Sequence, residues 1–183
     1  MRSALALALL LAGCCPPATT TRAARPRPEP ALRPVGDLPY DFFWRQRVTA
    51  RWGDGRSQTF DAVLQKHRGT LRLVGLSPLG VGFVIELRAD GTTHFQNRTG
   101  RRLPFAPSYM LADVQRAFYP WPSDRVQERH KDGHLVERTF RGKAHITYHD
   151  WRPGNDAARR VVVHHLRYGY VLVIETTEQK RLP

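Results

Sequence analysis

The stretch that decides the fold is LRLVGLSPLGVGFVIELRADG, Leu71 to Gly91. Two apolar runs with period-two alternation flank the connector SPLG at residues 77–80, a pattern that is typical of two antiparallel strands joined by a turn. Proline presets φ and glycine accepts conformations that other residues avoid, so turn chemistry explains Pro78 and Gly80. It does not explain Leu79, an apolar residue at a position where turns normally have a polar one.

The same alternation recurs along most of the chain. Before the connector it covers residues 42–52, where it is interrupted by Gln46, and residues 60–64. After the connector it returns in four runs, which are residues 135–140, 144–148, 161–168 and 171–177. The sequences KDG at 131–133 and YGY at 168–170 are hairpin signals. Successive hairpins predict an antiparallel, meandering sheet of about nine or ten strands.

One segment, APSYMLADVQRAFYPWP at residues 106–122, has its apolar side chains at helical spacing. Pro107 stands near its start and Pro120 at its stop, as expected for a helix. Gly75, Gly80 and Gly82 lie beside the apolar run and favour a bend in the sheet. We therefore predict a mainly β fold with a few helices (α+β), in which a curved antiparallel sheet surrounds one apolar helix. The sheet either buries this helix or holds it as a plug that something else can displace.

The N-terminal segment indicates export. Arg2 precedes an apolar run at residues 4–11, and small residues precede Cys14, as in a secretory signal peptide that is too short to remain as a membrane span. LAGC at 11–14 is similar to a bacterial lipobox, so Cys14 is expected to be acylated. The alternative is an ordinary signal peptide that ends near a cysteine. We therefore predict three parts, which are a signal peptide at residues 1–13, a lipid-anchored Pro/Arg-rich tether at 14–34 and a folded domain at 35–183.

Charge and cysteine content limit the partners. The chain has 29 Lys and Arg and 16 Asp and Glu, and residues 35–183 have a net charge of +9. A basic domain favours an anionic partner. Export argues against nucleic acid, and no nucleic-acid-binding motif occurs. The two cysteines, Cys14 and Cys15, are adjacent, so no disulfide between them can cross-link the folded part.

The sequence contains no recognisable catalytic motif. GxSxG, HExxH and phosphate-binding glycine loops are absent. His145 and His149 share a predicted strand face, and His130 and His134 flank a turn. Neither pair has a Cys or Glu nearby at ligand spacing. We therefore predict no enzyme activity, no metal site and no cofactor.

With these features the chain resembles the LolB outer-membrane lipoproteins, and more closely an uncharacterised family of bacterial lipoproteins related to LolA and LolB. The segments LVGLSPLG at 73–80 and MLADVQRAFYPWP at 110–122 carry the resemblance, which extends from about residue 41 to the C-terminus. It implies an antiparallel half-open β-barrel, with a helix plugging its concave face, whose apolar interior holds acyl chains. It also implies a leucine that protrudes from the connector, here Leu79, although this side chain could instead fold back on the sheet.

The expected function follows from the resemblance. We expect a lipid-anchored, periplasm-facing protein of a Gram-negative outer membrane that binds acyl chains, such as palmitate, of a lipoprotein or glycolipid and delivers them to the membrane. Its partners would be membrane lipid, this cargo and a periplasmic carrier protein, and we expect a monomer. The alternative is a non-catalytic adaptor lipoprotein that docks an anionic partner on its basic face.

Two sets of site residues are predicted from the resemblance and the pattern together. The membrane-insertion loop comprises Pro78, Leu79 and Gly80. The apolar lining for the acyl chain comprises Val81, Phe83, Ile85, Leu111, Val114 and Phe118.

Overall fold

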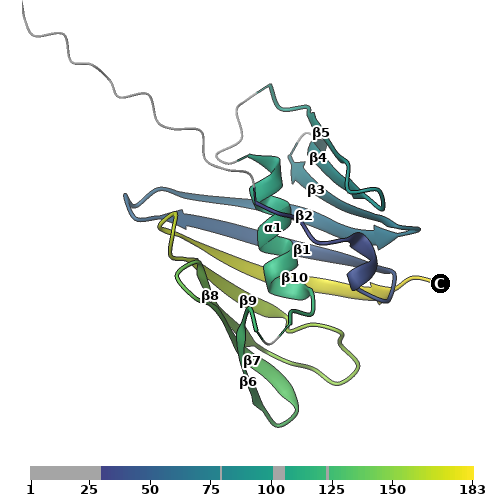
Figure 1. The fold of residues 1–183 in the computed structure, drawn as a ribbon. Coiled ribbons are helices and arrows are strands. Elements are labelled where there is room, and N and C mark those ends of the chain that lie inside the picture. Colours follow the sequence, from purple (N-terminus) through teal and green to yellow (C-terminus); the bar gives the residue numbers. More distant parts are fainter. Residues whose placement is uncertain (1–29, 79, 101–105, 123) are drawn as a thin grey trace, which may run out of the picture.

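The computed structural model describes residues 30–78, 80–100, 106–122 and 124–183, and the description below is of these residues. The signal peptide, Cys14 and the tether up to residue 29 lie outside them. The described part contains a short 3₁₀ helix, one α-helix and ten strands (Figure 1), which in chain order are η1 Val35–Asp37, β1 Phe42–Trp52, β2 Ser57–His67, β3 Thr70–Ser77, β4 Gly80–Arg88, β5 Thr93–Asn97, α1 Pro107–Phe118, β6 Gln127–Lys131, β7 His134–Phe140, β8 Ala144–His149, β9 Arg160–His165 and β10 Tyr170–Arg181.

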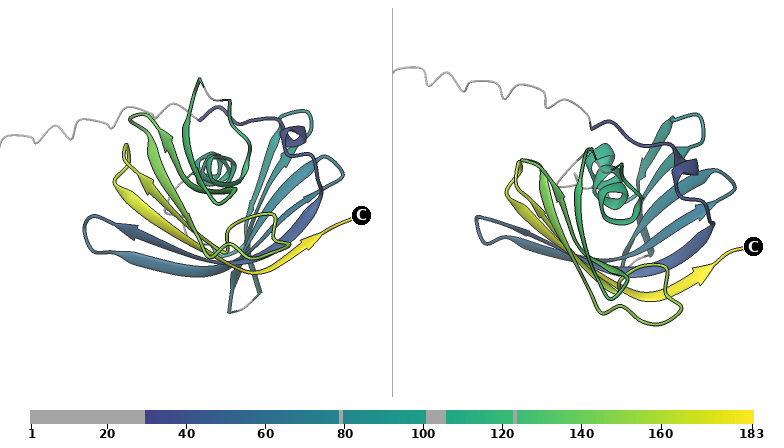
Figure 2. Two further views of the ribbon diagram at one scale, coloured as in Figure 1. Left: turned by 90° about the horizontal axis from the view of Figure 1, so that it is seen from below. Right: turned by 60° about the horizontal axis from the view of Figure 1, so that its bottom comes forward.

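The strands form one antiparallel sheet in the order β5-β4-β3-β2-β1-β10-β9-β8-β7-β6. Each strand pairs with its neighbour in sequence, except that β1 and β10, the first and last strands, pair at the centre. The edges are therefore β5 and β6, and the chain segment that joins them contains α1. Seen end-on, the sheet is a trough with α1 lying in its hollow (Figure 2). This confirms the predicted curved sheet with a helix at its concave face.

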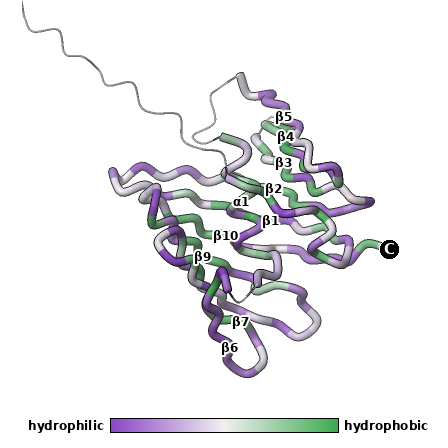
Figure 3. The backbone as a smooth tube through the Cα atoms, in the orientation of Figure 1, coloured by the Kyte–Doolittle hydropathy of each residue, from purple (hydrophilic) through white to green (hydrophobic). Residues whose placement is uncertain are grey.

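The alternation in β1 shows why these residues form a sheet with two different faces. Phe42, Trp44, Gln46, Val48 and Ala50 are buried, and the residues between them are exposed or half-buried. The buried set faces the hollow, because successive side chains of a strand point to opposite faces. Green, hydrophobic positions accordingly alternate with purple, hydrophilic ones along the strands in Figure 3.

Helix α1 begins and ends where the prolines predict. Pro107 occupies its first position, where a missing N–H costs nothing. At the other end the N–H of Tyr119 donates to the carbonyl oxygen of Gln115 at 2.9 Å, and Pro120 follows. The helix is buried along most of its length, because it lies within the trough.

The two edge strands, β5 and β6, show no alternating pattern in the sequence, although the expected total of nine or ten strands and the hairpin signal at 131–133 allow for them. Every residue of β5 and of β6 is exposed, so neither strand has a buried face that would produce an alternating pattern. The ends of the last two strands also differ from the prediction. β9 stops at His165, before the turn, and β10 continues to Arg181.

The glycine at position 75 has a packing role in the curved sheet. The pairing of β3 with β4 shifts register between Gly75 and Leu76, which is a β-bulge. A Cβ atom on Gly75 would lie 2.1 Å from the ring of Phe83, which is 6% exposed and held in the core. Phe83 therefore packs directly over the glycine backbone, as aromatic residues do over strand glycines.

We predict that Gly75→Ala destabilises the protein by about 1–3 kcal/mol, because the buried Phe83 ring must leave its position. Urea unfolding measures this change in free energy. Gly36→Ala is the matched control, because no heavy atom lies within 4 Å of the position of its added Cβ. Equal stability of the two variants would show that Phe83 adjusts freely.

Candidate functional site

The concave face of the sheet and helix α1 together form the candidate site. Of the predicted lining residues, Ile85 and Leu111 are completely buried, and Phe83 and Val114 are 6% and 7% exposed. Phe118 is half-buried, with its ring 5.1 Å from that of Trp44 on β1. These five side chains lie in or against the core that the helix shares with the sheet.

Val81 does not belong to this set, and the prediction that it shares a face with Phe83 is wrong. It is 40% exposed and pairs with Leu76, which pairs in turn with Asp61 on β2. Paired residues share a face, and Asp61 is on the exposed convex side. A bulge in β4 causes the error. Gly75 pairs with Phe83 and Leu76 with Val81, so Gly82 is an extra residue that reverses the alternation beyond it.

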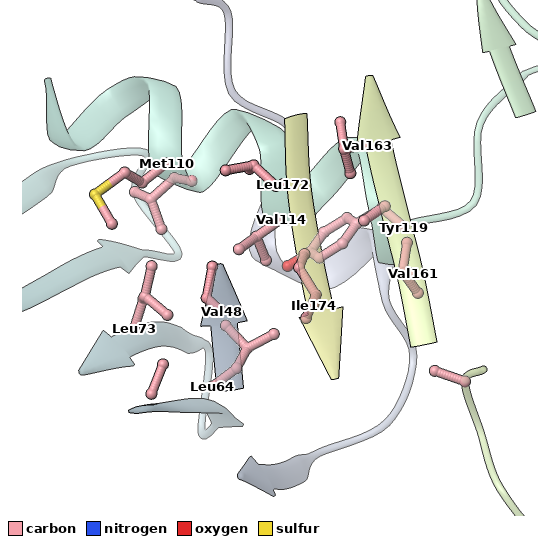
Figure 4. Close-up of a cluster of buried hydrophobic side chains, with 14 of the residues drawn as sticks. Val48, Leu64, Leu73, Met110, Val114, Tyr119, Val161, Val163, Leu172 and Ile174 are labelled. Atoms are coloured by element: carbon pink, nitrogen blue, oxygen red, sulfur yellow. The ribbon is translucent and has the colours of Figure 1, made fainter. Parts of the chain in front are cut away.

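The space between helix and sheet is small. One cavity of about 40 Å³ lies there, and its lining residues are Gln46, Val48, Phe60, Leu73, Met110, Asp113, Val114, Tyr170, Leu172 and Ile174. Figure 4 shows Met110 and Val114 of the helix near Leu73, Val48 and Ile174 of the sheet. A water molecule occupies about 30 Å³ in the liquid, so an acyl chain does not fit while the helix is in place.

A buried polar cluster adjoins this cavity. Asp113 on α1 is 3% exposed and accepts a hydrogen bond from the hydroxyl of Tyr170 on β10. Arg116 Nη1, one helical turn on, donates to Asp113 Oδ1 at 2.7 Å. Burial raises the pKa of Asp113, and these two hydrogen bonds oppose that rise. Burial also raises the pKa of Tyr170, and the neighbouring Asp113 carboxyl adds to the effect.

His165 completes the cluster from β9. It is 3% exposed, its Nε2 is 3.9 Å from Asp113 Oδ1, and its ring lies between those of Tyr168 and Tyr170, with centroids 4.5 and 4.9 Å away. Burial, together with the nearby charge of Arg116, lowers its pKa to about 4. The imidazole is therefore neutral at neutral pH.

The C-terminal end of α1 makes a second set of polar contacts to the sheet. The hydroxyl of Tyr148 on β8 donates to the carbonyl oxygen of Ala117 at 2.9 Å. Arg138 Nη1 on β7 donates to the carbonyl oxygen of Arg116 at 2.6 Å. The last carbonyls of a helix have no partner within it, and a cation there is favourable. These bonds hold the helix in one position on the sheet.

The segment before β1 is fastened to the same helix. The side-chain amide of Gln115, which is 1% exposed, accepts from the N–H of Arg33 and donates to its carbonyl oxygen, each at 2.8 Å. The Arg33 guanidinium pairs with Asp37 at 2.6 Å and lies 4.9 Å from the centre of the Trp121 ring. The predicted tether therefore joins the folded part before residue 34.

The remaining predicted loop is the β3–β4 connector. Pro78 and Gly80 are exposed, Gly80 has φ +112°, and Ser77 Oγ donates to the Gly80 carbonyl oxygen at 3.1 Å. A φ in this range favours glycine. Leu79 lies outside the described residues.

The convex face carries much of the basic charge, but opposite charges pair with it across strands. Arg47 is 3.0 Å from Asp61, and Arg72 is 2.7 Å from Glu86. Such exposed pairs contribute little to stability. They do reduce the free positive charge that an anionic partner would meet on this face.

The histidines with a possible metal role make ordinary contacts. His145 Nδ1 is 3.1 Å from Thr139 Oγ1, and His149 Nε2 is 2.9 Å from Thr147 Oγ1. Within the described ranges, no group of three or more His, Cys, Asp or Glu side chains is placed to hold a metal ion. His164 and His165 take opposite faces, one exposed and one buried.

Sequence reasoning missed the polar cluster, although signals for it existed. Asp113 stands between Met110 and Ala117 at helical spacing, so it falls on the apolar face of the helix. His165 follows Val161 and Val163 at period two, so it falls on the buried face of its strand. A polar residue at an apolar position of a predicted element indicates a buried polar contact.

Among the described residues, no helix is long and apolar enough to cross a membrane.

Comparison with known proteins places the chain in a family. A family model described as protein of unknown function (DUF3261) matches residues 43–178, and the chain belongs to this family. No curated protein matches the sequence.

Two solved structures are similar in fold. A LolA superfamily protein from Nitrosomonas europaea superposes with a TM-score of 0.52 at 12% identity, over 81% of this chain and 92% of that one. A putative outer membrane lipoprotein-sorting protein domain from Vibrio parahaemolyticus gives a TM-score of 0.48 at 9% identity, over 78% and 85%. The first of these comparisons shows that the fold is LolA-like, as the sequence resemblance implied, and at 12% identity the likeness concerns fold alone.

We predict that the stability of the protein falls as pH decreases from 6.5 toward 4, with a contribution from His165 of up to about 3 kcal/mol. Its pKa is lowered from 6.5 to about 4 in the folded state, so the unfolded chain binds the proton first. The contribution is present above pH 6.5 and is lost as pH falls through about 4. Urea unfolding across this range measures it.

The variant His165→Gln removes this titration and should flatten the pH dependence. Asp113 and Arg116 of α1 and Tyr170 of β10 face the imidazole and stay unchanged in the variant. His149→Gln, at an exposed position, is the control and should keep the wild-type slope. If His165→Gln also kept that slope, His165 would not be the titrating group.

Proposed function

We propose that this member of the DUF3261 family binds acyl chains on the concave face of its sheet and passes them to a membrane, without catalysis. In this proposal the chain is anchored through lipid on Cys14, the segment 14–34 acts as the tether and residues 35–183 form the carrier domain. We place it on the periplasmic side of a Gram-negative outer membrane, where it would act as a monomer that receives lipid or lipoprotein acyl chains from a periplasmic carrier.

The observation that carries the proposal is a continuous apolar face that a single short helix covers. Val48 and Ala50 of β1 and Leu172 and Ile174 of β10 are paired in register at the centre of the trough, and all four are buried. Helix α1, of 12 residues, lies over them as a separate element in the hollow (Figure 2). Such a face can be uncovered without breaking any strand pairing.

Magnitudes favour an exchange of helix for acyl chain. Each fully buried Val, Leu or Met contributes about 1.5–3 kcal/mol, so uncovering Met110, Leu111 and Val114 costs roughly 5–9 kcal/mol. A long acyl chain on the same face contributes on the order of 10 kcal/mol, at about 0.8 kcal/mol per methylene. The apolar contributions of helix and acyl chain are therefore of similar size, before the polar contacts of the helix are counted, as a carrier that both takes up and releases its cargo requires.

The β3–β4 connector is the proposed point of membrane contact. Pro78 and Gly80 are exposed at the tip of this hairpin, and Val81 beside them is one of the exposed large apolar side chains. Exposed apolar groups that gather at one tip are typical of surfaces that meet a partner or a membrane. In this proposal Pro78, Leu79 and Gly80 enter the lipid during delivery.

We predict that a photo-reactive phenylalanine analogue at position 172 forms adducts with acyl lipid, whereas the same analogue at position 173 does not. Leu172 is 8% exposed and faces the hollow, and Val173 is its neighbour on the opposite face of β10. Mass spectrometry of the irradiated, purified protein identifies the adducts. Adducts at both positions would indicate surface adsorption. If lipid were absent and a polyanion bound in a salt-sensitive way, the adaptor function would be supported.

We also predict that Leu79→Glu slows the transfer of labelled acyl lipid from the protein to vesicles, by about tenfold or more, because a charge at the membrane centre costs about 2.5–3.5 kcal/mol. Circular dichroism should show an unchanged fold. The control Ser57→Glu adds the same charge near the β1–β2 turn, at an exposed position on the convex face, where Ser57 pairs with the exposed Arg51. Wild-type transfer by Leu79→Glu would remove this residue from the mechanism.

A further inference from the structure

Asp113 presents a carboxyl group to the sheet at one end of the apolar face. The groups of the sheet that meet it are the hydroxyl of Tyr170, which donates to Oδ2, and Nε2 of His165, 3.9 Å from Oδ1. Its third partner, Arg116, is on the helix itself. If α1 left the trough, Asp113 and Arg116 would leave together, and Tyr170 and His165 would remain on the sheet.

The imidazole of His165 lacks hydrogen-bond partners in this arrangement. Only 3% of the residue is exposed. Neither ring nitrogen has a hydrogen-bond partner within the described residues. Buried polar groups without a partner are uncommon, and each is costly. At 3.9 Å the Asp113 oxygen is too far for a hydrogen bond. An acidic group that is free to approach, unlike a carboxyl fixed to the helix, could bond to both Tyr170 and His165.

The position of these two residues suits the head of an acyl ligand. Along the inner face of β10 the side chains are Tyr170, Leu172, Ile174 and Thr176, and Thr176 closes the far end by pairing with Gln46 at 3.2 Å. The row from Tyr170 to Thr176 is roughly 20 Å long at the rise of a strand. One lipid leaflet has a hydrocarbon depth of about 15 Å, so one acyl chain matches the length of the row.

We propose that Tyr170 and His165 bind the carboxylate of a fatty acid, and that Asp113 occupies this place as an internal stand-in while helix α1 covers the sheet. The inference rests on the proposed acyl-binding function and narrows its ligand class to chains with a free acidic head. The tail lies along Leu172 and Ile174, where Met110 and Val114 of the helix lie in the closed form.

The electrostatics of the site support this exchange. The charge of Arg116 is one cause of the low pKa of His165, and Arg116 moves away with the helix. A carboxylate then placed beside the imidazole favours its protonated form. Ligand binding thereby replaces the Asp113 contact with a stronger, charge-assisted one.

Photo-cross-linking of the full chain in lipid nanodiscs tests the proposal. The probes are palmitic acid with a diazirine in its chain and the methyl ester of the same molecule, and mass spectrometry gives the ratio of acid to ester adducts. We expect the wild type to favour the acid by about tenfold, the effect of a hydrogen bond to a charged group. Tyr170→Phe and, separately, His165→Gln should bring the ratio close to one.

Tyr148→Phe is the matched control. It also removes a hydrogen bond from sheet to helix, at the carbonyl oxygen of Ala117, so it loosens α1 and should raise both adducts without changing their ratio. Equal labelling of wild type by acid and ester would overturn the fatty-acid site and leave acyl binding intact. A fall in the ratio in Tyr148→Phe equal to that in Tyr170→Phe would also overturn the site, because helix closure would then set the ratio. Labelling by neither probe would overturn the proposed function as well.

Discussion

The connection between the two edge strands must cross the open side of the trough, and this constraint shapes the rest of the structure. Because β5 and β6 stand at opposite edges, the chain between them passes over the concave face and places α1 there. An apolar face that curves away from water needs a cover. The topology supplies one that is attached through its flanking connections and can lift without unpairing a strand.

Polar contacts fix the position of helix α1 on the sheet. The hydroxyls of Tyr148 and Tyr170 and the guanidinium of Arg138 reach the helix from three strands, β8, β10 and β7, and fix it more specifically than apolar packing could. Buried polar groups are costly when they lose their partners. Tyr148 and Arg138 hold only the closed form, whereas Tyr170 also becomes, once the helix moves, a site that a ligand can satisfy. Closure and ligand choice therefore meet at Tyr170.

Much of the fold could be predicted from the sequence, because the central strands and α1 each bury one face. The period of their apolar residues therefore indicates both the type of element and its buried side. The edge strands β5 and β6 bury neither face, so they leave no such pattern. Val81 lies on the other face because Gly82 is an extra residue in β4 and reverses the alternation. The glycines of this stretch indicate a bend, but they do not show at which residue the register shifts. The polar cluster joins Asp113 to residues much later in the chain. Tyr170, for example, is 57 positions away. Only the fold brings such residues together.

Hydrogen exchange of helix α1 with and without a bound acyl chain tests the central claim most directly. We propose that the helix and the acyl chain occupy the same face in turn. Backbone amides of residues 110–118 should therefore lose protection when palmitic acid is added, while the amides of β1 and β10 keep theirs. Bound palmitic acid with unchanged protection of α1 would contradict the exchange, because the cavity of about 40 Å³ beneath the helix cannot hold the chain.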